Sequence, residues 1–171
     1  MDNRKVKPEK FILDATAGYR MMWFNKQHPN ALYIDQRPEC EPDEIQDFTK
    51  LPYPDKTFKL IVFDPPHIKR TSENLNSNMI RDFGYLQPET WQDEIKKGFI
   101  ELWRCLENNG VLIFKWCNVY FPSNIILKLF PVKPLFYQIS ASHKRSNSGK
   151  KLKRVKTLWF CFMKIPEENK K

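Results

Sequence analysis

The sequence has few of the residues that build metal centres and disulfide frameworks. It contains three histidines and four cysteines, and no two of these cysteines form a C-x-x-C pair. Without that spacing, or a histidine placed beside a cysteine, we expect no zinc site and no other metal. We therefore interpret all four cysteines as free thiols with a structural role: Cys40, Cys105, Cys117 and Cys161.

Long hydrophobic runs are missing too. No apolar stretch approaches the roughly 20 residues that a membrane-spanning helix needs. The N-terminal segment, residues 1–10, is basic and lacks the apolar region of a secretory signal. We expect a cytoplasmic protein that does not enter a membrane. Because 41% of the 171 residues are hydrophobic, we also expect one folded domain over residues 1–171.

Positive charge is concentrated in one short segment. The chain has a formal net charge of +9, and residues 143–156 hold seven Lys and Arg with no acid, which leaves +2 for the rest. A basic patch of this kind is typical of a protein that binds a polyanion such as nucleic acid. The alternative is a solvated loop that contributes only to solubility.

Short apolar runs alternate with polar segments along the chain. The runs are residues 11–14, 31–35, 59–64, 110–116, 134–140 and 157–164. Continuous runs of this length are typical of strands in a mostly parallel sheet that helices cover on both faces. The last two runs have no helix between them, so we predict an antiparallel hairpin around the basic loop 143–156.

Two segments show helical periodicity. An apolar stripe runs from Pro88 to Glu107, and Asn109-Gly110 provides a stop signal after it. Residues 122–130 predict a shorter helix with Pro122 in its first turn. Strands that alternate with helices indicate an α/β fold with right-handed crossovers.

Three of the predicted strands end in an aspartate: Asp14, Asp35 and Asp64. Parallel strands bring their carboxyl ends to one edge, where α/β sheets bind ligands. Asp35 follows Asp14 by 21 residues, about the distance at which nucleotide-binding folds place a ribose-binding acid. We expect a helix to begin just beyond Gly18, although the full G-x-G-x-x-G motif is absent.

Taken together, "LDATAG" (13–18), "YID" (33–35), "DFTKLPYPDKTFKLIVF" (47–63), "DPPH" (64–67) and "LWRCLENNGVLIFKW" (102–116) resemble one family. The chain resembles the class I S-adenosylmethionine-dependent methyltransferases, which are Rossmann-like. Within them it is similar to the amino-methyltransferases marked by (D/N/S)-P-P-(Y/F/W). It also resembles the small methyltransferases of bacteriophages and mobile elements.

The resemblance implies S-adenosylmethionine as cofactor and a set of residues that contact it. They are Asp14, Ala15, Thr16, Gly18, Arg20, Asp35, Asp47 and Phe48. It assigns Asp35 to the ribose and Asp47 with Phe48 to the adenine end. Arg20 would bind the methionine carboxylate, or would be a surface arginine; Phe48 would face the cofactor ring, or simply pack in the core.

The DPPH motif carries the predicted chemistry. The resemblance assigns catalysis to Asp64, Pro65, Pro66 and His67. The Asp64 carboxylate and the Pro65 carbonyl can each accept one N–H of an exocyclic amine, and the two prolines hold these acceptors rigidly. His67 stands where the family has an aromatic ring, so it either stacks on the target base or accepts a proton.

The resemblance implies methyl transfer to N6 of adenine in nucleic acid, with DNA favoured over RNA. Phosphates would then contact the basic loop through Lys144, Arg145, Lys150, Lys151, Lys153 and Arg154. Residues 68–87 predict a loop that closes over the substrate or only connects two elements. Two alternatives stay open: methylation of a protein amine or amide, and an inactive nucleic-acid-binding protein. The protein would be a monomer or a homodimer.

Overall fold

The computed structural model describes residues 8–68, 78–142 and 155–166. In these ranges the strands are β1 (Ile12–Asp14), β2 (Ala31–Asp35), β3 (Glu44–Ile45), β4 (Phe58–Phe63), β5 (Leu106–Cys117), β6 (Phe136–Ser142) and β7 (Val155–Met163). The helices are α1 (Asn78–Phe83), α2 (Trp91–Cys105) and α3 (Ser123–Leu129), with a 3-10 turn at Pro38–Cys40. The two-residue strand β3 has no sequence signal and was not predicted.

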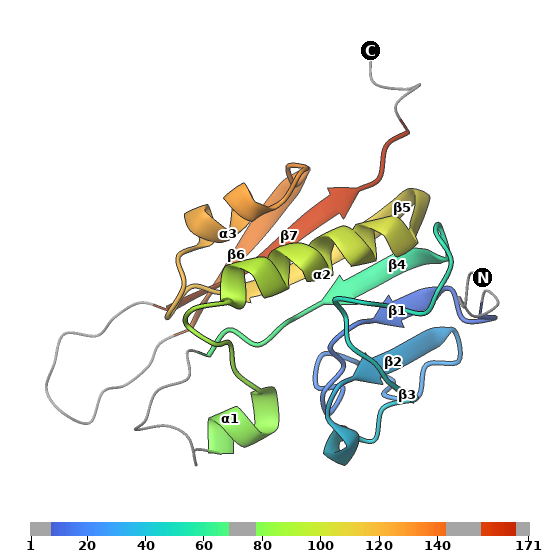
Figure 1. Ribbon diagram of the computed structural model, residues 1–171, viewed down its shortest axis with the longest axis horizontal. Coiled ribbons are helices and arrows are strands. Elements are labelled where there is room, and N and C mark those ends of the chain that lie inside the picture. The colour runs from blue at the N-terminus through green and yellow to red at the C-terminus, as the bar shows by residue number, and fades with distance from the viewer. Residues whose placement is uncertain (1–7, 69–77, 143–154, 167–171) are drawn as a thin grey trace, which may run out of the picture.

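The strands form one sheet in the order β3-β2-β1-β4-β5-β7-β6 (Figure 1). Neighbours from β3 to β5 pair in parallel, whereas β7 is antiparallel to both β5 and β6. This is a Rossmann-like topology with the predicted C-terminal antiparallel hairpin. The predicted fold class is confirmed.

Helix α2 forms because its apolar residues lie on one stripe. Ile95, Phe99 and Leu102 are fully buried against the sheet, while the opposite side of the helix is charged. The helix ends at Cys105, earlier than the predicted stop at Asn109-Gly110. The carbonyl of Cys105 accepts a hydrogen bond from Thr57 N–H (2.7 Å), and Leu106 is already extended. A neighbouring turn therefore ends the helix, and the strand starts at once.

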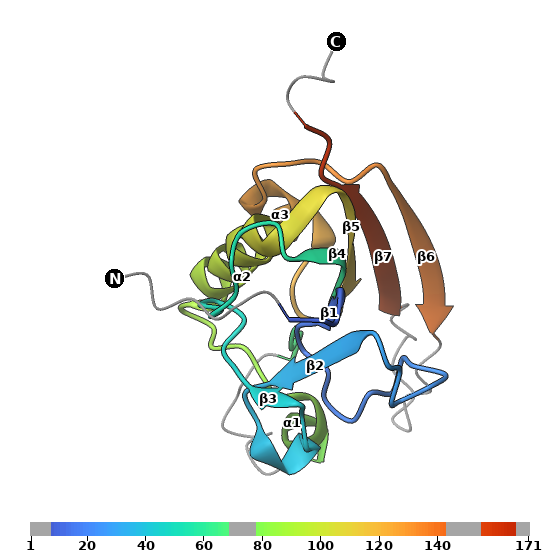
Figure 2. The same cartoon turned by 90° about the vertical axis from the view of Figure 1, so that its right-hand side faces the viewer.

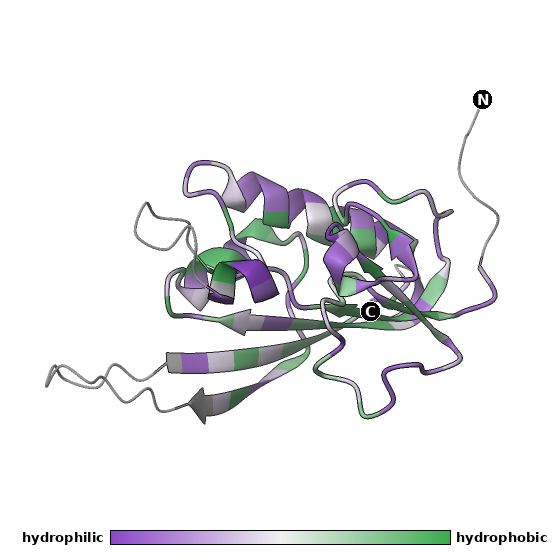
Figure 3. Ribbon diagram, turned by 90° about the horizontal axis from the view of Figure 1, so that it is seen from below, coloured by the Kyte–Doolittle hydropathy of each residue, from purple (hydrophilic) through white to green (hydrophobic). Residues whose placement is uncertain are grey.

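Both α2 and α3 lie on the same face of the sheet (Figures 1 and 2). We call this the helix face and the other the open face, because no helix of the described residues covers it (Figure 3). The prediction that helices cover both faces is therefore wrong for the part of the chain that the structure describes. The alternation in β5 shows the result: Leu112, Phe114 and Trp116 are buried, whereas Ile113 and Lys115 are half-buried.

The helix expected just beyond Gly18 does not form. Residues 15–30 make tight turns instead, with hydrogen bonds from Arg20 N–H to Ala17 O (2.8 Å) and from Trp23 N–H to Arg20 O (3.2 Å). Arg20 has a φ of 55°, which a right-handed helix does not allow. These turns replace the helix that would have covered the open face.

Two clusters of buried side chains result. The large cluster lies between the helix face and helices α2 and α3, and includes Phe63, Phe114 and Phe162. The small cluster lies on the open face beneath the 15–30 turns, where Trp23 packs edge-on against Tyr33 with ring centroids 5.0 Å apart. All four cysteines are free and buried, as predicted. In the described ranges no helix has the length and apolarity to cross a membrane.

Candidate functional site

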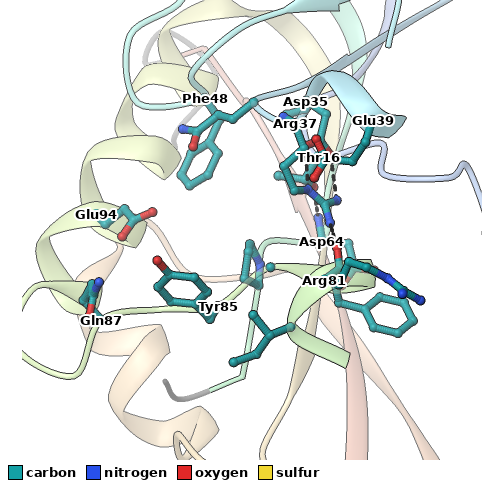
Figure 4. A pocket seen from close by; sticks show the side chains of 16 residues that line it. Thr16, Asp35, Arg37, Glu39, Phe48, Asp64, Arg81, Tyr85, Gln87 and Glu94 are labelled. Carbon is teal, nitrogen blue, oxygen red and sulfur yellow. Dashed lines mark hydrogen bonds and ion pairs between the residues drawn. The ribbon is translucent and has the colours of Figure 1, made fainter. Parts of the chain in front are cut away.

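Two adjoining cavities lie at the carboxyl ends of β1, β2 and β4. The large cavity has a volume of about 450 Å³, and helix α1 with the residues after it forms one of its walls (Figure 4). The small cavity, about 90 Å³, includes Gly18 and His67 in its lining. Thr16, Arg37, Asp64 and Pro66 line both cavities, so the predicted catalytic motif lies where the two meet.

Asp64 is held from two sides. Its backbone N–H donates to Thr16 Oγ1 (2.9 Å), which ties the DPPH turn to the β1 turn. Lys115 Nζ, at the carboxyl end of β5, donates to Oδ2 (2.6 Å). The other carboxylate oxygen, Oδ1, is buried and has no hydrogen-bond partner among the described residues. A buried oxygen of this kind is costly unless a ligand donates to it.

The rest of the DPPH turn is packed tightly. Pro65 is buried and Pro66 half-buried, and a Cβ at Gly84 would lie 3.0 Å from Cγ of Pro66. Gly84 has a φ of 71°, so glycine lets the end of α1 approach the turn. His67 lies edge-on to Trp116 with ring centroids 6.4 Å apart. Asp64, Pro65, Pro66 and His67 all line the small cavity, and their catalytic roles stay predictions.

Asp35 lines the large cavity, and both its oxygens are occupied. Gly18 N–H donates to Oδ2 (2.8 Å), and Arg37 donates through its backbone N–H, Nε and Nη2. Burial alone raises the pKa of Asp35, but the Arg37 bonds and charge outweigh it, so the pKa lies below its usual range. Asp35 is therefore ionised and organises the glycine turn.

Arg37 links Asp35 to helix α1. Its Nη1 donates to the carbonyls of Arg81 (3.2 Å) and Asp82 (2.9 Å) at the end of that helix. Figure 4 shows the guanidinium between Asp35 and Arg81, on the side of the cavity opposite Phe48 and Glu94. Residues 68–87, expected to form a loop, therefore include a helix and a wall of the cavity. Arg37 was not predicted, since no motif marks it.

Asp14 lies behind the cavities rather than in them. It is fully buried, accepting Trp23 Nε1–H at Oδ2 (2.7 Å) and Thr16 N–H at Oδ1 (3.3 Å). Burial raises its pKa to about 7, and the negative charges of Asp64 and Asp35 add to the effect. Asp14 therefore shapes the turn that carries Ala15 and Thr16, both of which line the large cavity.

Arg20 and Asp47 line neither cavity. The Arg20 guanidinium donates to Glu41 O (3.0 Å) and Asp43 Oδ1 (3.1 Å) and lies 4.2 Å from the Tyr33 ring centroid. Asp47 is exposed and accepts both Thr49 N–H and Thr49 Oγ1–H at 2.8 Å. In this arrangement Arg20 joins the 15–30 turns to residues 41–43, and Asp47 stabilises the turn that it forms with Thr49.

Phe48 lines the large cavity and also packs in the core, where the centroids of the Phe48 and Phe63 rings are 5.2 Å apart. Glu94 of α2 and Tyr85 line the same cavity and were missed, because they come from segments without a motif. Burial raises the pKa of Glu94, and the charge of Asp47 raises it further. The signal that could have found Glu94 is its place in the first turn of α2, beside the strand ends.

The six predicted phosphate-binding residues, from Lys144 to Arg154, lie outside the described residues. Within the described ranges, no group of three or more His, Cys, Asp or Glu side chains is arranged to hold a metal ion.

Comparisons with known proteins find the fold and no sequence relative. No protein-family model matches the chain, and no curated protein matches it. Among solved structures, the PH0226 protein from Pyrococcus horikoshii OT3 is similar with a TM-score of 0.53 at 12% identity, over 91% of this chain and 81% of that one. A possible exported protein from Bordetella parapertussis has a TM-score of 0.43 at 8% identity, covering 94% of this chain and 63% of its own. At such identities the first likeness shows a shared Rossmann-like fold alone.

Proposed function

We propose that the protein is an S-adenosylmethionine-dependent methyltransferase that modifies N6 of adenine in nucleic acid. The observation that carries the proposal is Asp64. One carboxylate oxygen is held by Lys115 at 2.6 Å and the other is buried without a partner among the described residues, where two cavities meet. That oxygen is suited to accept one N–H of an amine entering from the small cavity.

The large cavity fits the proposed cofactor in size and chemistry. When bound, S-adenosylmethionine supplies a methyl group on a positively charged sulfur. Carboxylates at the cavity wall, among them Asp35 and Glu94, complement a positive charge, and the Phe48 ring provides a flat apolar wall. Asp35 accepts four N–H groups already, which use its lone pairs, so ribose hydroxyls there have to displace part of Arg37.

The chain itself contributes mainly orientation. An exocyclic amine of adenine is a weak nucleophile because its lone pair is delocalised into the ring. Acceptance of its two N–H groups by Asp64 Oδ1 and the Pro65 carbonyl favours a pyramidal nitrogen whose lone pair is free to react. Lys115 and Thr16 fix the carboxylate and its backbone, so little reorganisation is needed during the reaction.

Asp64 provides the direct test. Asp64→Ala should abolish transfer of labelled methyl from S-adenosylmethionine to an adenine-containing oligonucleotide, while calorimetric affinity for the cofactor changes little. Asp64→Asn keeps one carbonyl oxygen that can accept an N–H, and the (D/N/S)-P-P-(Y/F/W) motif allows Asn at this position, so this variant should retain more activity than Asp64→Ala. Activity of Asp64→Ala within a fewfold of the parent would contradict the amine-orienting role.

His67 tests the choice between its two roles. If the ring stacks on the base, His67→Phe and His67→Tyr should keep most of the activity. If it accepts a proton, both variants should lose activity to a similar extent. Unfolding temperature serves as the control, because His67 also lies against Trp116.

The charge distribution supports a polyanionic substrate such as nucleic acid. Between Glu107 and Glu167 the sequence has eleven Lys and Arg and no acid, so this third of the chain has a net charge of +11 and the remainder −2. A polyanion is attracted to such a region. Labelled methyl transfer in a cell extract, with and without DNase or RNase, tests this and distinguishes DNA from RNA. Label that survives both nucleases and is lost with protease would favour the protein amine or amide.

A further inference from the structure

The open face of the C-terminal half of the sheet carries side chains that the proposed chemistry does not use. In β5, β7 and β6 the register places Lys115 beside Trp159 and Trp159 beside Gln138. Two residues away on each strand, Ile113, Cys161 and Phe136 form a second row on the same face. We call these six residues the hairpin face. Views along two directions place α2 and α3 on the other side of these strands (Figures 2 and 3).

A groove of about 290 Å³ lies in the hairpin face. Five of the six residues of the face line it, with Ser140 and Phe160; only Lys115 does not. Phe136 is 63% exposed, and Trp159 is half-buried and lines the groove. An aromatic surface next to amide and hydroxyl groups can hold a flat ring and bind the polar groups at its edge.

The hairpin face is continuous with the candidate active site. Lys115 Nζ donates to Asp64 Oδ2 at 2.6 Å and lies 5.4 Å from the Trp159 ring centroid. Lys115 therefore has the predicted catalytic carboxylate on one side and the aromatic ring on the other. A polymer whose reacting group lies at Asp64 has a direct path across Lys115 onto Trp159.

The charge of this region favours a phosphate-bearing polymer. Strands β5, β6 and β7 contain no acid between Val111 and Met163, and Lys156 on β7 is exposed. The chain between β6 and β7 contains six of the eleven basic residues, by sequence. An acidic protein would match the charge but gains nothing specific from a stacking ring, whereas a nucleic-acid strand uses both.

We propose that the hairpin face binds single-stranded nucleic acid next to the target nucleotide, with a base stacked on Trp159 and its edge bonded by Gln138. Phe136 extends the apolar surface for the neighbouring base. This inference rests on the proposed function for the identity of the reacting group, but binding of the strand is a separate property. Duplex DNA fits less well, because its bases are already stacked on one another.

The test measures binding of a short fluorescein-labelled single-stranded DNA by anisotropy, without cofactor. Trp159→Ala should weaken binding roughly tenfold or more, as loss of one stacked base does, while the slope of affinity against salt stays the same. Heparin, a polyanion without bases, is the second probe and should bind both proteins equally. Trp159→Phe, which keeps a ring, should retain most of the affinity for DNA.

Phe136 and Tyr137 form a matched pair for the control. They are neighbours on β6 with similar exposure, 63% and 58%, but Tyr137 faces Phe160 on the helix side. Phe136→Ala should weaken DNA binding and Tyr137→Ala should not. Unfolding temperatures of all variants show whether a loss reflects folding, and Trp159→Phe keeps the test valid if Trp159→Ala does not fold.

Three results would overturn the proposal. The first is equal weakening of heparin and DNA by Trp159→Ala, since charge alone would then explain binding. The second is equal loss in the Phe136 and Tyr137 variants. The third is a homodimer in light scattering that Phe136→Ala dissociates while DNA affinity stays unchanged, because a second copy would then occupy the face. DNA binding that depends on Trp159 without any methyl transfer would instead count only against the proposed function.

Discussion

The two faces of the sheet differ in what covers them and in what their side chains can do. On the helix face, Phe63, Phe114 and Trp116 are fully buried beneath α2 and α3. On the open face, the alternate residues of β5, such as Ile113 and Lys115, are half-buried. One strand therefore supplies packing to one side and accessible side chains to the other.

This difference separates stability from function. Burial of aromatic and aliphatic side chains on the helix face stabilises the fold through the hydrophobic effect. Among the residues that the structure describes, only the 15–30 turns, near β1 and β2, cover the open face, and its accessible side chains reach Asp64 through Lys115. Substitutions on the helix face should lower stability, whereas substitutions on the open face should mainly alter binding and catalysis.

The largest expected difference is between Phe114→Ala and Ile113→Ala, adjacent residues on opposite faces. Phe114 is fully buried and packs against Phe63 and Phe160, so its truncation should cost about 3–5 kcal/mol of unfolding free energy. Ile113 is half-exposed, so its truncation should cost about 1–2 kcal/mol. Urea unfolding measures both. Equal losses would mean that something covers the open face in solution.

Asp14 tests the part of the open face that the 15–30 turns cover. Its pKa of about 7 lies above that of the unfolded chain, so the folded protein binds one more proton between about pH 4 and 7. Its contribution to stability is present below pH 4 and is lost as the pH rises to about 7, on the order of 2–4 kcal/mol. Asp14→Asn, which does not titrate, should be more stable than the parent at pH 8.

Thermal unfolding of both proteins from pH 4 to pH 8 measures this difference. The Asn side chain keeps an oxygen for the short bond from Trp23 Nε1–H and gives up only the longer bond from Thr16 N–H (3.3 Å), so the turn should be largely preserved. A parent protein whose stability follows the same pH curve as the variant would show that Asp14 does not titrate in this window.

A substitution at Gly98 tests whether packing on the helix face positions Phe48 in the large cavity. A Cβ at Gly98 in α2 would overlap the ring of Phe48, which lines that cavity. Gly98→Ala should therefore cost about 1–3 kcal/mol of stability through overpacking and should also weaken cofactor binding by moving Phe48. Gly110→Ala, remote from both cavities, is the control for a glycine in a tight site. Unchanged cofactor affinity in calorimetry would show that Phe48 does not contact the cofactor.

Lys115→Met should have the smallest effect on stability and a clear one on catalysis. The Lys115–Asp64 pair is partly exposed, with side-chain accessibilities of 23% and 18%, so its loss should cost about 1 kcal/mol. Without Lys115 the Asp64 carboxylate is free to rotate, and kcat should fall roughly tenfold, equivalent to about 1.4 kcal/mol, with cofactor affinity unchanged. Lys156→Met, an exposed lysine on β7, is the control. Equal kcat values in the two variants would remove Lys115 from the positioning of Asp64.

Much of the architecture could be predicted because its signals are local. The apolar runs that became β1, β2 and β4 to β7, and the stripe that became α2, depend on residues close together in sequence. The three aspartates at strand ends also indicated the edge of the sheet where the two cavities lie. Arg37 and Tyr85 could not be found in this way, because they reach the cavity from segments whose position depends on packing.

The sequence by itself determined the strands, the helix stripe and the DPPH turn at one strand end, since hydrophobic period and proline geometry act over a few residues. Only the tertiary structure decided that the chain after Gly18 forms turns, because Trp23 bonds Asp14 and Arg20 bonds Asp43 across the fold. It likewise decided that Lys115 meets Asp64, 51 residues away, because that contact depends on the register of β4 with β5. The open face results from both features. The helix expected after Gly18 does not form, and β5 pairs with β4 next to the candidate site.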